Sequence, residues 1–358
     1  MFLYVDIETF SEVPLSGGTY RYAEAAEVML FAWAIDDGPV SVLECDRNEK
    51  HPAELVEAWR DPCVTIVAHN VGFDRTVLRA RWPNVPPLER WHCTMAQARA
   101  HGLPGSLATL GAIFGVAEDQ QKQKDGKALV QLFCKPRPKN SKLRRATRET
   151  HPEQWAQFVD YAAHDILAMR ALHRKMPTWN YTGFERELWQ LDQTINARGF
   201  AVDLDLADAA VETIARVEKS LSGRVGAITS GDVDSANQRD ALLAYILDAY
   251  GVELPNMQAP TLERRLEDPE LPEAVKELIA IRLEASTTSV KKYRRVREGV
   301  NSDGRLRGTL EFCGAGRTGR WSGRVFQPQN LARPTLKNAE IEAGIEAVKA
   351  GIADLIYA

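Results

Sequence analysis

Five side chains in this sequence have types and spacings that suit the binding of metal ions. They are Asp6, Glu8, Asp74, Tyr161 and Asp165. Four carboxylates gathered in one site would repel one another, but they suit hard divalent cations, which prefer oxygen ligands. Two such ions roughly 3.5–4 Å apart can clamp a phosphodiester, and a nearby tyrosine hydroxyl can orient a metal-bound hydroxide. The set therefore predicts phosphoryl transfer to water.

The element that must carry the first pair is a strand. The stretch "FLYVDIETF" is apolar apart from its acids, and we predict a buried strand over residues 2–9. Because strand side chains alternate between faces, Asp6 and Glu8 should point the same way, about 7 Å apart. Like charges on one face are costly unless a cation binds them. Taken alone, the pair is equally typical of a solvated strand end.

The other acids are expected on helices. Asp74 falls one turn into a helix predicted over 71–81, with Asn70 as its N-cap, after a strand at 63–68. Tyr161 and Asp165 stand at i and i+4 of an amphipathic helix predicted over 153–175, so they share a face. Each motif alone also fits an ordinary capped or amphipathic helix. The motifs occur in this order, and each lies on a predicted strand or helix that could place its side chains in one site. Together they favour a functional site over a structural role.

Composition sets broad limits. The chain has 358 residues, which favours two or more domains, and its formal net charge of −4 carries no global basic signature for nucleic acid. Five cysteines without a CxxC pair indicate reduced thiols in a cytoplasmic protein. The apolar run at 28–35 is too short to span a bilayer, so no membrane partner is expected.

The remaining pattern changes character along the chain. Residues 1–176 have the pattern of an α/β domain. Two further strands are predicted at 28–35 and 39–45, joined by the turn Asp36-Asp37-Gly38. Two further helices are predicted at 52–60 and 106–114, and the second would have Ser106 as its N-cap and end at Gly115. Residues 184 to about 300 are nearly all helical, with one very long helix at 272–299. Strands and Gly-rich turns follow, and then a final helix marked by Ile341, Ile345, Val348, Ile352 and Leu355.

The motifs "DIET", "HNVGFD" and "YAAHD" resemble the three exonuclease motifs of the DEDD superfamily in its tyrosine-bearing branch. The histidine branch would have its histidine five residues before Asp165, where this chain has Asp160. Tyr161 therefore indicates the tyrosine branch. The resemblance implies a ribonuclease H-like mixed sheet and 3′→5′ removal of nucleoside 5′-monophosphates. By motif position, Asp6, Glu8 and Asp165 would hold the tighter metal, Asp6 and Asp74 would flank the second, and Tyr161 would position the water. Whether the two cations are Mg²⁺ or Mn²⁺ stays open.

The same resemblance implies contacts with the terminal nucleotide. Thr9, Asn70 and Phe73 fall where the superfamily touches it, although Phe73 could equally belong to the core.

The second half resembles family A DNA polymerases of bacteriophage type. "ERELWQLDQTINARGFAVD" matches the segment between exonuclease and thumb, "IAIRLEASTTSVKKY" the long thumb helix, and "TGRWSGRVFQPQNLARP" the T-G-R-x-S…P-x-N element leading into the palm. By this resemblance Arg320, Gln329 and Asn330 would face the minor groove of a primer–template.

Pro, Asn, Thr and Gly stand together near residues 177–183, which we predict to be a linker. With the resemblance, the chain divides into an exonuclease domain at 1–176, this linker, a helical thumb-like region at 184–304 and an incomplete palm at 305–358. After Pro334 the palm aspartate, the fingers helix and the palm Asp-Glu pair are not found. We therefore expect no nucleotide addition by this chain alone. A shortened chain, a natural fragment and a separate chain carrying palm and fingers are all open explanations.

Two basic stretches are candidates for DNA contacts. The loop 135–148 could hold phosphates of single-stranded DNA or could be a solvated, mobile loop, and both interpretations stay open. In 291–297, Lys291 and Lys292 could grip a duplex backbone, or the stretch could be a charged helix C-terminus.

The prediction is thus a two-metal-ion 3′–5′ exonuclease of proofreading type that acts on DNA 3′ ends. Two alternatives are a catalytically silent fragment that grips primer–template and an RNA-trimming exonuclease of the same superfamily. The intact acids argue against the first and the thumb-like segment against the second. If a phage encodes it, the protein would work in the bacterial host's cytoplasm; its oligomeric state is left open.

Overall fold

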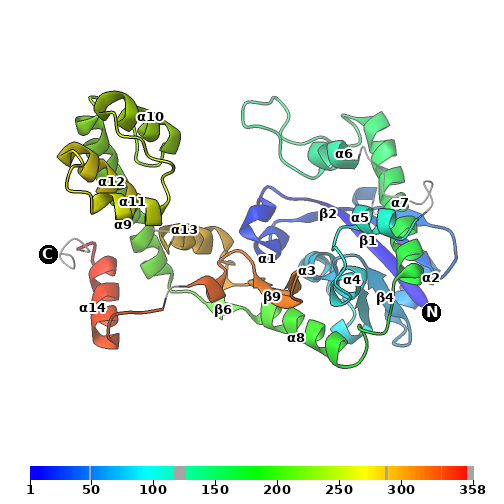
Figure 1. Cartoon of the computed structure of the whole chain (residues 1–358). Coiled ribbons are helices and arrows are strands. Elements are labelled where there is room, and N and C mark those ends of the chain that lie inside the picture. Colours follow the sequence, from blue (N-terminus) through cyan, green and yellow to red (C-terminus); the bar gives the residue numbers. More distant parts are fainter. Residues whose placement is uncertain (48–49, 117–125, 287–288, 332, 353–358) are drawn as a thin grey trace. The chain divides into compact units, whose positions relative to one another are not determined.

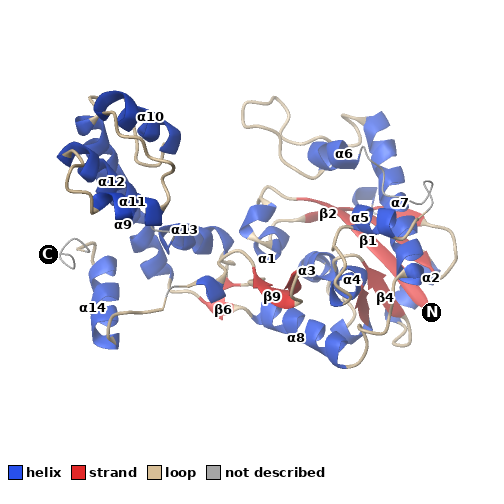
Figure 2. Ribbon diagram, viewed as in Figure 1, coloured by secondary structure: helices blue, strands red, loops and turns tan. Residues whose placement is uncertain are grey.

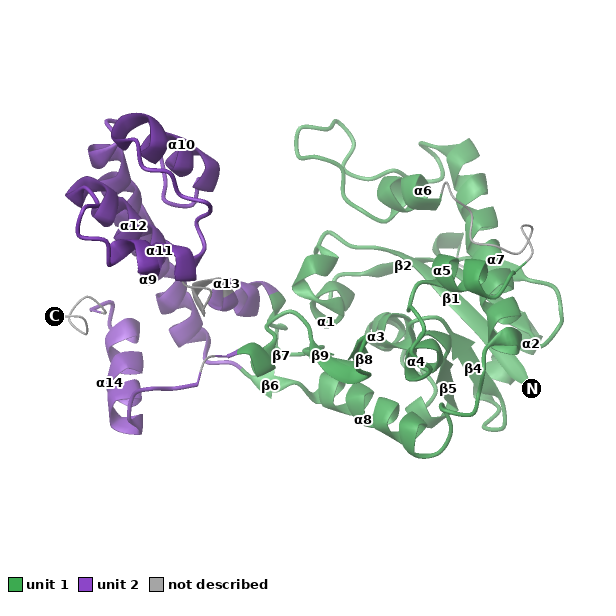
Figure 3. Cartoon of the chain, in the orientation of Figure 1, with its two compact units in different colours: residues 1–201, 299–330 green, residues 202–298, 331–358 purple. Residues whose placement is uncertain are grey.

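The computed structural model describes residues 1–47, 50–116, 126–286, 289–331 and 333–352. Its contacts divide the chain into two compact units (Figure 3). The first contains residues 1–201 and 299–330, and the second contains residues 202–298 and 331–358. The chain thus leaves the first unit after Ala201 and returns to it at Gly299. Among the described residues, no helix is both long and apolar enough to cross a membrane.

A five-stranded mixed sheet forms the centre of the first unit (Figures 1 and 2). Its strands are β1 (Phe2–Phe10), β2 (Glu27–Ile35), β3 (Ser41–Glu44), β4 (Thr65–Ala68) and β5 (Trp91–Cys93). They lie in the order β3-β2-β1-β4-β5; β2 is antiparallel to β1 and β3, and β4 is parallel to β1 and β5. The predicted α/β class with a mixed sheet is confirmed.

Helices cover both faces of this sheet. In the first unit they are α1 (Thr19–Ala23), α2 (Ala53–Arg60), α3 (Val71–Arg81), α4 (Thr94–Ala100), α5 (Leu107–Ile113), α6 (Gly126–Phe133), α7 (Pro152–Lys175) and α8 (Phe184–Arg198). Ser106 caps α5 by accepting a hydrogen bond from the Thr109 amide, and Gly115 follows the helix with a φ of +56°, as predicted. Four of these strands and helices of the first unit were not predicted from the sequence, namely strand β5 and helices α1, α4 and α6.

The alternation of β1 decides which side each acid faces. Leu3, Val5 and Ile7 join the core cluster that contains α2 and α3, whereas Tyr4 and Phe10 join the cluster that contains α5, α6 and α7. Asp6 and Glu8 have the parity of Tyr4. They therefore lie on the face of the sheet that α7 covers.

Residues 177–183, the predicted linker, are held against the first unit. The Asn180 amide donates to Nε2 of His101 over 3.1 Å, and the Gln97 side chain donates to the Pro177 carbonyl over 2.9 Å. Tyr181 is 3% exposed and belongs to the same core as Trp189 of α8. The compact units therefore group this segment and α8 with residues 1–176. The functional names given to the four segments stay predictions.

A hairpin from late in the sequence completes the first unit. It consists of β8 (Leu310–Ala315) and β9 (Arg320–Gly323), followed by a 3-10 turn at Pro328–Asn330, and two shorter strands, β6 (Phe200–Ala201) and β7 (Arg305–Leu306), pair beside it. Phe312 and Cys313 enter the core cluster of β1. Arg99 of α4 forms a 2.5 Å ion pair with Glu311, which also pairs with Arg324.

The second unit is helical. Its helices are α9 (Leu204–Ile228), α10 (Arg239–Tyr250), α11 (Ala259–Leu266), α12 (Glu273–Ala285), α13 (Ser289–Gly299, whose last residue begins the return to the first unit) and α14 (Asn338–Lys349). The single helix predicted over 272–299 is wrong, because α12 ends at Ala285 and α13 begins at Ser289. The final helix ends sooner than predicted: Ile352 lies beyond it, and Leu355 lies outside the described residues.

Candidate metal centre

Three of the predicted acids meet at one place in the first unit. Asp6 and Glu8 project from β1, and Asp165 projects from α7. Their ligand oxygen atoms all lie within 4.8 Å of one another. Glu8 is 9% exposed and Asp165 is 4% exposed, whereas Asp6 is half-buried. Three carboxylates this close in a largely buried place have the spacing to share a single cation.

The fourth predicted acid, Asp74, lies on α3 and contacts the strand that carries Asp6 and Glu8. It is 3% exposed and accepts a hydrogen bond from the Ile7 backbone of β1. Burial raises the pKa of the Asp74 carboxyl well above its usual value, and the charges of Asp6 and Glu8 raise it further. Asp74 is thus affected by the charge of the cluster but does not belong to the group of three acids whose oxygen atoms lie within 4.8 Å of one another.

Tyr161 lies one turn before Asp165 on α7 and is 3% exposed. Burial raises the pKa of its hydroxyl well above the usual range, and the charges of Asp165, Glu8 and then Asp6 add to the effect. Its side chain also shares a hydrogen bond with Asp165. The hydroxyl therefore stays neutral and can donate a hydrogen bond at any ordinary pH.

The chemistry of these donors fits hard divalent cations. Every candidate ligand is a carboxylate, which is the ligand that Mg²⁺ and Mn²⁺ prefer. A cation would also relieve the repulsion that raises the pKa of Asp74. Both ions suit this donor set equally well.

One neighbour of the cluster was missed from the sequence. Cys134, just after α6, donates its thiol to Oε2 of Glu8 over 3.6 Å. A single cysteine among five has no pattern that predicts such a contact. All five cysteines are free thiols, as predicted.

The residues expected at the terminal nucleotide are placed differently from one another. Thr9 is 4% exposed and its hydroxyl shares a 2.7 Å hydrogen bond with that of Tyr22. Asn70 precedes α3 as predicted, with a left-handed φ of +73°, but its side chain makes no capping hydrogen bond to the described residues of that helix. Phe73 is half-buried, and its ring centroid lies 5.7 Å from that of Tyr22. Their contacts with DNA stay predictions.

Asn70 and Phe73 also line a cavity of about 430 Å³ between α3, α4, α8 and the β8–β9 hairpin. Asp192 lines it too and is 1% exposed. Gln193 and Asn196 donate to its Oδ2, whereas its Oδ1 has no hydrogen-bond partner within the described part of the chain. Burial raises the pKa of Asp192 to about 7.

Three arginines of the basic loop 135–148, Arg144, Arg145 and Arg148, form ion pairs with the body of the first unit. Arg144 pairs with Glu12 at 3.1 Å and Arg145 with Glu27 at 2.6 Å. The loop is therefore anchored at its C-terminal half. The exposed lysines of the loop, which are candidates for DNA, are Lys135, Lys139 and Lys142.

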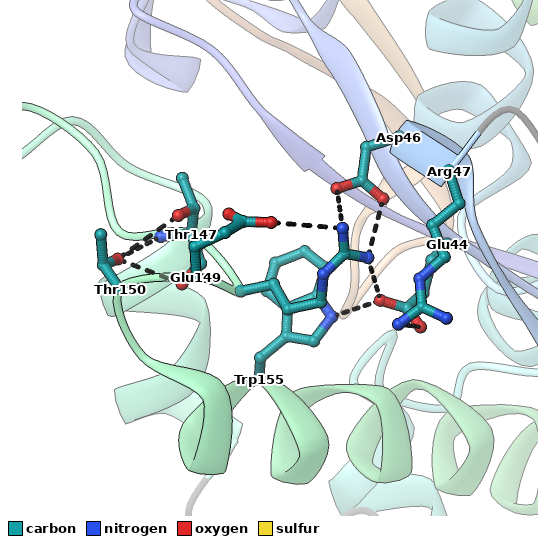
Figure 4. Close-up of polar contacts among 8 residues, drawn as sticks. Glu44, Asp46, Arg47, Thr147, Glu149, Thr150 and Trp155 are labelled. Atoms are coloured by element: carbon teal, nitrogen blue, oxygen red, sulfur yellow. Dashed lines mark hydrogen bonds and ion pairs between the residues drawn. The ribbon is translucent and has the colours of Figure 1, made fainter.

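Arg148 is the last of these anchors, and Figure 4 labels its partners Glu44, Asp46 and Glu149. Arg148 pairs with Glu44 at 2.9 Å and with Asp46 at 3.4 Å. The indole of Trp155, on α7, donates to the same Glu44 carboxylate over 2.7 Å. The loop, the edge strand β3 and the start of α7 are thus joined by one carboxylate.

The remaining predicted DNA contacts lie in both units. In the second, Lys292 is a half-buried residue of α13, and the side chain of Lys291 lies outside the described residues. In the first unit, the predicted contacts are Arg320, at the start of β9, and Gln329 and Asn330, in the 3-10 turn; all three are exposed. Their roles in binding DNA stay predictions.

The acidic cluster on β1 and α7 lies on a mixed sheet, and the fold of the chain is similar to part of a solved DNA polymerase. The POL domain of Pol1 from M. smegmatis, solved with DNA primer-template and dNTP, covers 92% of this chain, and the match covers 53% of that chain, with a TM-score of 0.54 and 15% identity. Escherichia coli RNase D also matches, over 80% of this chain and 70% of its own, but its 13% identity and TM-score of 0.36 carry no argument.

The chain is 34% identical to a DNA polymerase of Bacillus phage SP02 over 355 residues. This match covers 98% of the chain and 54% of the phage protein, so the chain spans about half the length of this curated relative. The resemblance to a phage DNA polymerase is therefore confirmed. No family model matches the chain.

Proposed function

We propose that this chain is the 3′–5′ exonuclease part of a phage-type DNA polymerase, which releases nucleoside 5′-monophosphates from DNA 3′ ends. The observation that carries the proposal is the meeting of Asp6, Glu8 and Asp165 within 4.8 Å, beside Asp74 and Tyr161. The sequence relative, a DNA polymerase, supports DNA over RNA as the substrate.

In this proposal Asp6, Glu8 and Asp165 hold one divalent cation, and Asp6 and Asp74 hold a second. When bound, the cations stabilise negative charge on the phosphodiester and make water nucleophilic at neutral pH. The protein supplies the rest. The neutral hydroxyl of Tyr161 orients the water through a hydrogen bond, and its own hydrogen bond with Asp165 fixes the direction of that hydroxyl.

DNA would be held by positively charged side chains outside the carboxylate cluster. Lys139 and Lys142 of the basic loop are exposed, and so is Arg320 of the hairpin. The phosphates of a single-stranded 3′ end and of a primer–template duplex are the groups these side chains would contact. We also propose that the polymerase reaction itself needs palm and fingers from outside residues 1–358.

The test is a degradation assay on single-stranded DNA labelled at its 5′ end. The wild-type chain is incubated with Mg²⁺, with Mn²⁺ or with EDTA, beside Asp165→Ala. We expect a ladder that shortens from the 3′ end, and only with metal and Asp165. A matched RNA strand should be shortened far more slowly. Intact DNA in both metals, with a folded protein that still binds DNA, would favour the catalytically silent fragment instead.

A further inference from the structure

Helix α6 contacts the candidate site at both of its ends. At its start, Gly126 lies against the ring of Tyr161. At its end, Phe133 stacks on Phe158 of α7, with ring centroids 5.1 Å apart, and the next residue, Cys134, donates to Glu8. No sequence motif pointed to this helix.

The contact between Gly126 and Tyr161 leaves no room for a side chain. A Cβ atom on Gly126 would lie 2.6 Å from Cδ2 and 2.8 Å from Cζ of the Tyr161 ring. Carbon atoms attract best near 3.5–4.0 Å, so both separations are strongly repulsive. Any residue larger than glycine therefore has to displace the ring or move the helix.

Glycine is not needed here for its backbone freedom. Gly126 is the first residue of α6, and it is not among the glycines of the described chain that have a positive φ. Its conformation suits alanine, which favours helices more than glycine does. The need for glycine at this position therefore comes from the ring of Tyr161.

The ring cannot give way freely. Tyr161 is 3% exposed and lies nearly parallel to Phe158, with an interplanar angle of 6° and centroids 6.3 Å apart. Phe158 is itself stacked on Phe133 of α6. The same helix thus bounds the tyrosine directly through Gly126 and indirectly through the aromatic stack.

We propose that Gly126 is a positioning residue for the nuclease reaction, because the bare backbone at the start of α6 sets the place of the Tyr161 ring and hence of its hydroxyl. This inference rests on the proposed function. Gly126 acts through Tyr161, whose ring supplies the three atoms nearest to a Cβ built at this position.

The test compares Gly126→Ala with Gly223→Ala, whose Cβ would meet nothing within 4 Å in α9. We expect Gly126→Ala to lower kcat for shortening of single-stranded DNA by about 10- to 100-fold, with KM changed less than about threefold. Gly223→Ala should match the wild type in both constants. A kcat for Gly126→Ala close to that of the wild type would overturn the inference while leaving the proposed function standing.

A double-mutant cycle with Tyr161→Phe separates positioning from general damage. If Gly126 acts through the hydroxyl, Gly126→Ala should reduce kcat by less than about twofold in the Tyr161→Phe background. A full additional loss there, about 10-fold, would mean that the substitution disturbs the carboxylates, and the inference would be wrong.

A readout without metal or substrate covers the remaining cases. A 3-fluorotyrosine at position 161 should change its ¹⁹F resonance in metal-free Gly126→Ala and keep it in Gly223→Ala. An unchanged resonance would overturn the inference, whether or not the wild type has nuclease activity. A wild type without nuclease activity would instead overturn the proposed function. If Gly126→Ala does not fold, Gly126→Ala with Phe158→Leu opens space beside the ring and is compared with Phe158→Leu alone, because losing the stacked phenyl ring shifts the resonance by itself. A folded double variant with the resonance of Phe158→Leu would again contradict the inference, and a resonance that differs from it would support the inference.

Discussion

The guanidinium of Arg145 lies over the ring of Phe10, 4.1 Å from its centroid, while it forms a 2.6 Å ion pair with Glu27. Phe10 is the last residue of the strand that carries Asp6 and Glu8. Arg145 therefore belongs to the support of that strand. A basic residue in the loop 135–148 can serve the fold rather than the substrate, and the two roles can be separated by mutation.

Replacing Lys139 and Lys142 by alanine should weaken DNA binding about three- to tenfold at low salt. Both side chains are exposed, and removing each cation from a phosphate should lower the slope of log affinity against log salt by about 0.7 for single strands. Fluorescence anisotropy with labelled single-stranded DNA measures both effects. The thermal midpoint should not change; unchanged affinity and slope would leave the loop without a role in binding DNA.

Arg145→Ala should instead lower the free energy of unfolding, by about 1 kcal/mol. The change removes a cation–π contact and an ion pair whose arginine is mostly shielded from water. Urea unfolding followed by fluorescence gives the value. Lys139→Ala is the matched control from the same loop, and an equal loss of stability there would contradict the distinction.

Tyr161→Phe should lower kcat by about 10- to 100-fold without unfolding the protein. The phenyl ring keeps the stack with Phe158, and only the hydroxyl that orients the water is removed. Single-turnover degradation of 5′-labelled DNA measures the step directly. Asp160→Ala removes the exposed neighbouring carboxylate and should leave the rate as it is. Equal effects of the two substitutions would argue against a special role for the tyrosine.

Adding Mg²⁺ or Mn²⁺ should raise the thermal midpoint of the wild-type protein. Cation binding only to the folded carboxylate cluster would stabilise it by about 2.7 kcal/mol when the free ion is at 100 times its Kd. Differential scanning fluorimetry with and without EDTA detects the shift. Asp165→Asn should lose most of it. The same shift in that variant would place the bound ion elsewhere.

Asp192 should make stability depend on pH. Burial raises its pKa from 3.8 to about 7 in the folded protein, so between about pH 4 and pH 7 the folded state binds a proton that the unfolded chain has released. Stability should therefore fall as pH rises through this window and level off above it. In Asp192→Asn this fall, on the order of 4 kcal/mol, should be missing. Urea unfolding at several pH values checks this, with the exposed Asp248→Asn as control.

Much of the site's framework could be predicted because its signals are local. The alternation in β1 put Asp6 and Glu8 on one face, and the spacing of Tyr161 and Asp165 put both on one turn of α7. β5 was missed because three residues cannot show an alternating pattern. Gly126 was missed because its significance lies in a ring 35 positions away, which no local pattern records.

The packing of the segment 177–183 could not be predicted from its composition. Its Pro, Asn, Thr and Gly predicted a linker, and the segment does form turns. Yet Tyr181 is buried, because the surrounding core offers its ring a place that composition cannot reveal. The arginines of the basic loop are similar, since the glutamates that bind Arg144 and Arg145 come from distant parts of the chain.

The first unit can be completed only after most of the second has been synthesised, because residues 202–298 separate its two parts in the sequence. Trp189 and the residues of β1 share their core cluster with Phe312 and Cys313, and the β6–β7 pair joins Ala201 to Arg305 only after residues 202–298 have been made. At 5–20 residues per second, a ribosome needs roughly 5–20 seconds to supply that stretch. During this interval the nascent sheet exposes apolar surface that the hairpin will cover. Such transiently exposed apolar surface favours aggregation and chaperone binding.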